Sequence, residues 1–114
     1  MHEASIATHL IRALERRIEE GEIAGKVRGI SLRVGRMTAV VPENLRFMFG
    51  VLSEGSELEG AKLEIEEVGI RGRCRACEAE FDIQDICFLC VRCGSAEIDI
   101  TSGRELMIIA VEVE

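Results

Sequence analysis

The chain has 114 residues, of which 47% are hydrophobic and 31% are charged, a balance typical of a small globular protein. No apolar run approaches the ~20 residues of a membrane span, and no basic and apolar leader indicates export, so we expect a cytoplasmic protein without a membrane partner. The formal net charge of −7 disfavours binding to nucleic acid or to an anionic membrane surface.

The first predicted element is an amphipathic helix between residues 6 and 18 that ends near Gly21. Its apolar side chains recur every three or four residues, with charged side chains outside that stripe. Glu3 lies in or before the first turn, where the helix dipole favours a carboxylate by ~0.3–1 kcal/mol. A strand follows, because apolar and other residues alternate from Ile30 to Gly35.

The chain from Pro42 onward is predicted to form one more helix and two more strands. Pro42 suits the first turn of a helix that buries Leu45, Met48, Phe49 and Leu52. Apolar and charged residues alternate from 62 to 66, which predicts a strand with one solvent-exposed face. Residues 106–111 are apolar on both faces, which suits a more buried strand that we expect between the other two. The predicted fold is α+β, a three-stranded sheet with two helices and a cysteine module inserted before the last strand.

The module contains all five cysteines, and without an export signal these indicate metal binding rather than disulfides. Two Cys-x-x-Cys pairs, Cys74/Cys77 and Cys90/Cys93, are separated by twelve residues and can present four thiolates to one ion. Four sulfur ligands suit zinc or iron and leave no open position, so the site is expected to be structural. Gly94 permits the positive φ of a turn around the metal.

Cys87 leaves an alternative, because Cys87 and Cys90 have the same two-residue gap. We favour Cys90/Cys93 on the stretch "CVRCGS", and we expect Cys87 to be a small buried thiol.

The chain begins "MHE", which places an imidazole next to the α-amine. The Met1 amine, the backbone nitrogen and imidazole of His2, and the Glu3 backbone nitrogen can supply a planar four-nitrogen set, which Ni(II) and Cu(II) prefer. The alternative is a frayed terminus without a ligand. His9 would lie ~10 Å from His2 on a continuous helix, too far to share an ion, and we expect it to be solvated.

Four motifs occur together: "MHE" followed by a serine and an amphipathic helix, a first Cys-x-x-Cys pair, a second pair in "CVRCGS", and the closing "SGRELMIIAVEVE". With these motifs the chain resembles the HypA/HybF family of hydrogenase nickel-incorporation proteins over essentially its full length. Two departures are Val91, where the family commonly has proline, and the additional Cys87.

The resemblance implies a nickel metallochaperone that binds Ni(II) at Met1, His2 and Glu3. It also implies a zinc-ribbon module that holds structural Zn(II) through Cys74, Cys77, Cys90 and Cys93. The implied partners are the accessory GTPase HypB and the large subunit of a [NiFe] hydrogenase, and in some members the nickel also serves urease maturation. On this interpretation residues 1–69 form the nickel-binding α+β domain, residues 70–103 the inserted zinc-ribbon domain, and residues 104–114 the final strand of the nickel-binding domain.

Two other functions fit part of the pattern. A zinc ribbon can bind nucleic acid or a transcription complex, but the acidic charge and the four aromatic residues, all Phe, offer neither a phosphate track nor a stacking platform. A rubredoxin-like iron protein would use the same four thiolates. We find no catalytic triad, phosphate loop or catalytic carboxylate pair, so we expect no enzyme, and the sequence leaves both a monomer and a dimer open.

Overall fold

The computed structural model describes residues 2–84 and 87–114. The chain forms two compact units, which are described separately as the helical unit and the cysteine unit. The helical unit comprises Met1–Leu32, Val40–Glu66 and Met107–Glu114, and the cysteine unit comprises Arg33–Ala39 and Glu67–Leu106.

The first helix, α1, spans Glu3–Glu19 and confirms the predicted amphipathic helix. It buries the apolar stripe of Ala7, Leu10, Ile11 and Leu14. His2 is its N-cap residue in an extended conformation, and Gly21, with φ +78°, follows its end. The position of that glycine agrees with the usual left-handed residue beyond a helix C-terminus.

The second helix, α2, spans Pro42–Leu52 and has Pro42 in its first turn, as predicted. It buries Leu45 and Phe49, which lie four residues apart on one face. Leu52 is 40% exposed and does not belong to that buried face, contrary to the prediction. The helix therefore has a narrow buried face and leaves apolar side chains at the surface.

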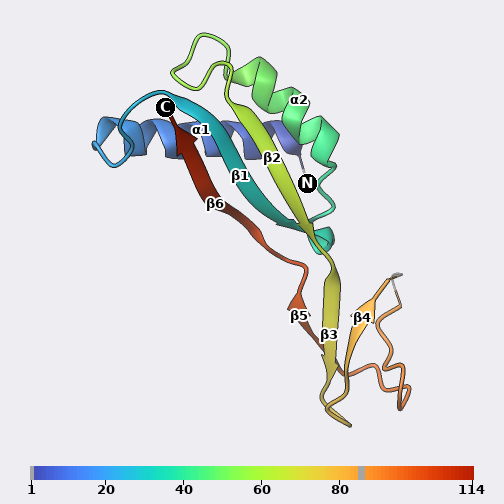
Figure 1. The fold of residues 1–114 in the computed structure, drawn as a ribbon. Coiled ribbons are helices and arrows are strands. Elements are labelled where there is room, and N and C mark those ends of the chain that lie inside the picture. The colour runs from blue at the N-terminus through green and yellow to red at the C-terminus, as the bar shows by residue number, and fades with distance from the viewer. Residues whose placement is uncertain (1, 85–86) are drawn as a thin grey trace. The chain divides into compact units, whose positions relative to one another are not determined.

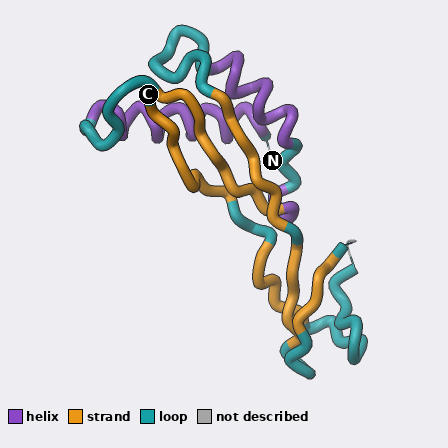
Figure 2. The backbone as a smooth tube through the Cα atoms, in the orientation of Figure 1, coloured by secondary structure: helices purple, strands orange, loops and turns teal. Residues whose placement is uncertain are grey.

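The sheet of the helical unit contains β1 (Val27–Gly35), β2 (Lys62–Val68) and β6 (Leu106–Val113). The strand order is β2-β1-β6, and both helices cover the same face (Figures 1 and 2). Ile30, Leu32 and Val34 of β1 are buried, which confirms the alternation read from the sequence. A short 3-10 helix, Arg36–Thr38, follows β1. Within the described residues, no helix combines the length and apolar character required to cross a membrane.

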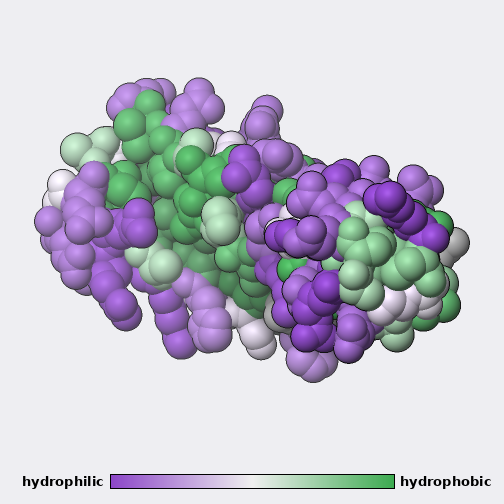
Figure 3. Space-filling model, turned by 90° about the horizontal axis from the view of Figure 1, so that it is seen from below, coloured by the Kyte–Doolittle hydropathy of each residue, from purple (hydrophilic) through white to green (hydrophobic). Residues whose placement is uncertain are grey.

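The expected central position of the last strand is wrong. β1 lies in the centre and β6 lies at an edge of the sheet. Its apolar side chains remain partly open to solvent, since Met107 is 47% exposed and Val113 44%. Both helices cover the same face of this sheet, so an apolar composition on both faces of a strand does not guarantee burial. Figure 3 shows hydrophobic side chains gathered at the surface in the view from below.

The cysteine unit contains an antiparallel sheet in the order β4-β3-β5. Its strands are β3 (Ile70–Cys74), β4 (Glu80–Ile83) and β5 (Ile98–Ser102). The buried core is small and consists of Cys74, Phe81, Ile83 and Cys90, with partly buried apolar neighbours around it. Two of these four residues are cysteines, so the core of this unit coincides with its candidate metal site. The α+β fold class is confirmed.

Candidate metal sites

Four cysteines converge at one point of the cysteine unit. The Sγ atoms of Cys74, Cys77, Cys90 and Cys93 all lie within 4.8 Å of one another. Cys74 Sγ lies 3.6 Å from Cys93 Sγ, and Cys77 Sγ lies 3.6 Å from Cys90 Sγ. Two sulfurs bound tetrahedrally to one ion at ~2.3 Å would be ~3.8 Å apart, so the spacing fits a four-sulfur metal site.

Each Cys-x-x-Cys pair is formed by the same local backbone turn. In the first turn the Glu78 N–H donates to the Cys74 carbonyl at 2.8 Å, and in the second the Gly94 N–H donates to the Cys90 carbonyl at 2.9 Å. The residue after each pair is left-handed, with φ +66° at Glu78 and +77° at Gly94. The sequence predicted this conformation at Gly94 but carried no such signal at Glu78.

Backbone N–H groups favour the thiolate form of Cys90. The N–H groups of Cys93 and Arg92 point at Cys90 Sγ from 3.4 and 3.3 Å, and they lower the pKa of this thiol to about 6. At Cys93 a backbone N–H of Ser95 favours the thiolate, but the neighbouring Cys74 side chain, burial and Cys90 outweigh it and raise the pKa to about 12. The neighbouring sulfurs thus oppose full ionisation of the cluster, and a bound cation would stabilise all four cysteines as thiolates.

Cys87 lies outside this group, and its expected burial is wrong. The thiol is exposed, whereas Cys74 and Cys90 are buried. Phe81 and Ile83 fill the small core beside the metal-site cysteines, which leaves Cys87 at the surface. Its side chain is not one of the four clustered sulfurs, so Cys90 and Cys93 form the second pair.

The second candidate site is the start of α1, where Met1 lies outside the described residues. His2 is exposed and makes no side-chain capping hydrogen bond, so its imidazole is not used by the helix. The first intrahelical hydrogen bond runs from the Ile6 N–H to the His2 carbonyl at 3.2 Å. The amides of His2 and Glu3 precede this bond and have no backbone partner within the helix.

The Glu3 carboxylate is engaged with the segment that leads into α2. Its Oε2 accepts a hydrogen bond from the Val41 N–H at 3.1 Å. This hydrogen bond, followed by the N–H of Glu3 itself, lowers the pKa of the Glu3 carboxyl below its ordinary value. The Glu3 carboxylate is therefore a charged hydrogen-bond acceptor whose partner is the Val41 N–H.

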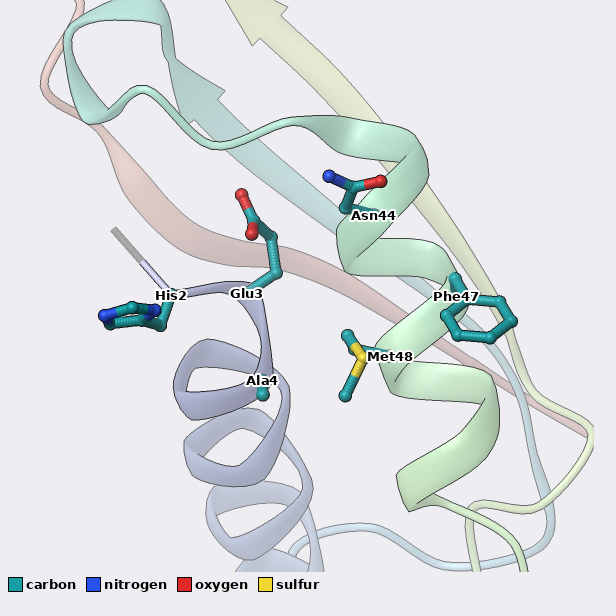
Figure 4. A pocket seen from close by; sticks show the side chains of 6 residues that line it. All are labelled: His2, Glu3, Ala4, Asn44, Phe47 and Met48. Carbon is teal, nitrogen blue, oxygen red and sulfur yellow. The ribbon is translucent and has the colours of Figure 1, made fainter.

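An open pocket of about 350 Å³ lies between the start of α1 and α2. It is lined by His2, Glu3, Ala4, Asn44, Phe47 and Met48 (Figure 4). The His2 imidazole points away from α2, whereas the Glu3 carboxylate extends toward the chain before α2 (Figure 4). The α2 residues of this pocket, Asn44, Phe47 and Met48, reach it through packing between the helices, which no local sequence pattern reveals. His9 is exposed, as expected, and does not line the pocket.

An α+β unit joined to a ribbon with four converging thiols has the architecture of a small metal-binding protein. A family model described as "Hydrogenase/urease nickel incorporation, metallochaperone, hypA" matches residues 1–113, and the chain belongs to this HypA family. The resemblance noted from the sequence is thereby confirmed.

Individual relatives agree with this assignment. The chain is 44% identical over 115 residues to a hydrogenase maturation factor HypA of Chlorobaculum tepidum, with all of both chains covered. It is 40% identical to the HypA of Desulfatibacillum aliphaticivorans, over 99% of this chain and 87% of that protein. The solution structure of the Ni metallochaperone HypA from Helicobacter pylori is similar in fold, with TM-score 0.70, 24% identity and coverage of 99% and 97%.

Proposed function

We propose that this protein binds Ni(II) at its N-terminus and delivers it to the large subunit of a [NiFe] hydrogenase during maturation. The proposed ligands are the Met1 amine, the imidazole and backbone nitrogen of His2, and the backbone nitrogen of Glu3. The observation that carries the proposal is the exposed His2 directly before α1, with an imidazole that does not cap the helix. Membership of a nickel-incorporation family supports the same cargo.

The start of a helix suits this ligand set for an electrostatic reason. Backbone nitrogens bind Ni(II) after losing their protons, and the positive end of the helix dipole stabilises the negative charge that remains. The amides of His2 and Glu3 have no backbone acceptor within the helix, so metal binding breaks no backbone hydrogen bond of α1 and displaces only the contact of the Glu3 N–H with its own carboxylate. The exposed position also leaves the ligands open to stepwise exchange with a recipient.

For the cysteine unit we propose a structural Zn(II) held by Cys74, Cys77, Cys90 and Cys93. The donor set fits this ion, because four thiolates are a common tetrahedral zinc site without a free position for water. The zinc would stabilise a unit whose own core is small.

We further propose that the protein works by capture and handover in the cytoplasm, without catalysing a reaction. Its proposed partners are the GTPase HypB, the hydrogenase large subunit and, as the family description suggests, urease maturation proteins.

The test is a calorimetric nickel titration of the untagged, zinc-loaded protein, with His2→Ala and with a variant that carries two residues before Met1. We expect one tight nickel per chain and a large loss of affinity in both variants. His9→Ala is the matched control, because His9 is the other histidine and is exposed on the same helix. Unchanged affinity in both N-terminal variants would exclude the proposed site.

A further inference from the structure

The Glu3 carboxylate joins the beginnings of two helices. Glu3 is the first residue of α1, and Val41, whose N–H it binds at 3.1 Å, is the N-cap residue of α2. The two residues are 38 positions apart in the chain. The bond therefore ties the first turn of α1 to a second element of the helical unit.

The bond satisfies a donor that α2 does not satisfy itself. In a capping box the third helical residue reaches back to the N–H of the N-cap residue, usually with a Glu or Gln side chain. In α2 that position is Asn44, and Val41 has no side chain that can cap the helix. Glu3 supplies the acceptor from another helix instead.

The same contact places the carboxylate away from the His2 imidazole. Figure 4 shows the Glu3 side chain directed toward the chain before α2, while the His2 ring points away from α2. The N-terminal end of α1 would otherwise have the mobility common to chain termini. A bond to α2 restrains the backbone of Glu3, whose nitrogen is a proposed nickel ligand.

We propose that Glu3 is a positioning residue for the nickel site, whose carboxylate binds the Val41 N–H and orders the first turn of α1 without ligating the metal. This inference rests on the proposed N-terminal nickel site. A planar set of four nitrogens is complete without a carboxylate oxygen. Groups that orient metal ligands typically change metal affinity by ~10–100-fold when they are removed.

The test compares variants that remove either side of the hydrogen bond. Glu3→Ala removes the acceptor, Glu3→Gln keeps an oxygen that can accept from the Val41 N–H, and Val41→Pro removes the donor but leaves the carboxylate. The φ of −92° at Val41 lies just outside the usual proline range of about −65 ± 15°, so circular dichroism first checks that Val41→Pro folds. Glu43→Ala controls for the loss of an acidic group near the start of α2.

We expect Glu3→Ala and Val41→Pro to weaken nickel binding ~10-fold with an unchanged nickel absorption spectrum. Glu3→Gln and Glu43→Ala should lose much less than ~10-fold, because the orienting bond to the Val41 N–H is intact in both. In the metal-free protein, hydrogen exchange of the Val41 amide should accelerate in Glu3→Ala but not in Glu3→Gln.

Two results would overturn the inference while leaving the N-terminal site intact. One is an altered nickel spectrum in both Glu3 variants, which would identify the carboxylate as a ligand. The other is wild-type affinity and wild-type Val41 exchange in Glu3→Ala. Failure of the nickel site itself is seen separately in His2→Ala, and the exchange measurement does not depend on nickel.

Discussion

Gly35, at the end of β1, packs directly against the carbonyl of Gly103: a Cβ on Gly35 would lie 2.0 Å from that oxygen. The same oxygen accepts a hydrogen bond from the Met37 N–H at 2.8 Å, which limits its freedom to move away. We therefore expect Gly35→Ala to lower the free energy of unfolding by ~1–3 kcal/mol, the usual range for overpacking. Urea unfolding monitored by circular dichroism measures this change.

The matched control is Gly50→Ala in α2, where a Cβ would meet no atom within 4 Å. There the substitution should stabilise the protein by up to ~1 kcal/mol, because alanine is the better helix former. Equal effects at Gly35 and Gly50 would contradict the close packing at Gly35.

Removal of the metal from the four-cysteine site should unfold the cysteine unit. Its core is small and shares Cys74 and Cys90 with the site, so metal binding is expected to supply much of its folding free energy, on the order of 10 kcal/mol. A strong chelator should collapse the amide NMR dispersion of residues 70–84 and 87–103. Metal analysis confirms that the site is empty. If the amide dispersion is then retained, the metal has no structural role.

The cysteines should differ in their contribution to metal binding. Cys90→Ser should lose the metal, whereas Cys87→Ser, at an exposed thiol outside the cluster, should retain it. Metal analysis of both variants is decisive for the ligand set. The wild-type protein purified in air should be colourless, since visible Fe(III)-thiolate absorption would identify iron instead of zinc.

The left-handed residues after the two Cys-x-x-Cys pairs predict opposite responses to substitution. Gly94→Ala places a Cβ at φ +77° and should destabilise the zinc-loaded protein by ~1 kcal/mol. Glu78→Gly relieves the same strain at φ +66° and should be neutral or mildly stabilising, since the exposed ion pair of Glu78 with Arg73 contributes little. Thermal unfolding of both variants checks the signs, and a stabilising Gly94→Ala would be inconsistent with this turn.

Glu105 should make stability depend on pH. Its pKa is lowered by hydrogen bonds to its own N–H and to that of Gly103, the latter at 2.6 Å. A lowered folded-state pKa stabilises the protein above the unfolded-state pKa of ~4.3, and this contribution is lost as pH falls through the folded-state value. The difference in unfolding free energy between wild type and Glu105→Gln should therefore be largest at neutral pH and vanish in acid.

Acid also releases zinc, but it does so from the wild type and from Glu105→Gln alike. The difference in their unfolding free energies therefore reports on the Glu105 carboxylate. Glu80→Gln, at an exposed position of β4, is the control and should show a smaller difference. If the difference in unfolding free energy between wild type and Glu105→Gln increased on acidification, the lowered pKa of Glu105 would be contradicted.

Nickel affinity should fall on acidification. The metal must displace protons from the terminal amine, the His2 imidazole and backbone amides, so protons compete at every proposed ligand. Titrations over a pH series should show proton release on binding and weaker binding at lower pH. Affinity independent of pH would argue against amide and imidazole ligands.

Local sequence patterns were sufficient for several elements of this protein. The period of α1, the start of α2 at Pro42 and the positive φ of Gly94 each depend on residues within a few positions, so the sequence predicted them correctly. The spacing of the two Cys-x-x-Cys pairs also selected the four sulfurs that converge. The combined motifs were specific enough to identify the HypA family.

Other features were decided by tertiary structure alone. The apolar composition of β6 does not distinguish an edge from a centre, because strand order depends on the pairing of distant segments. Cys87 is exposed because other side chains fill the small core, which local sequence does not reveal. The bond between Glu3 and Val41 joins residues 38 positions apart and exists because two helices pack together. The sequence by itself determined the family and the candidate ligands, whereas the packing of the chain decided which groups surround and orient them.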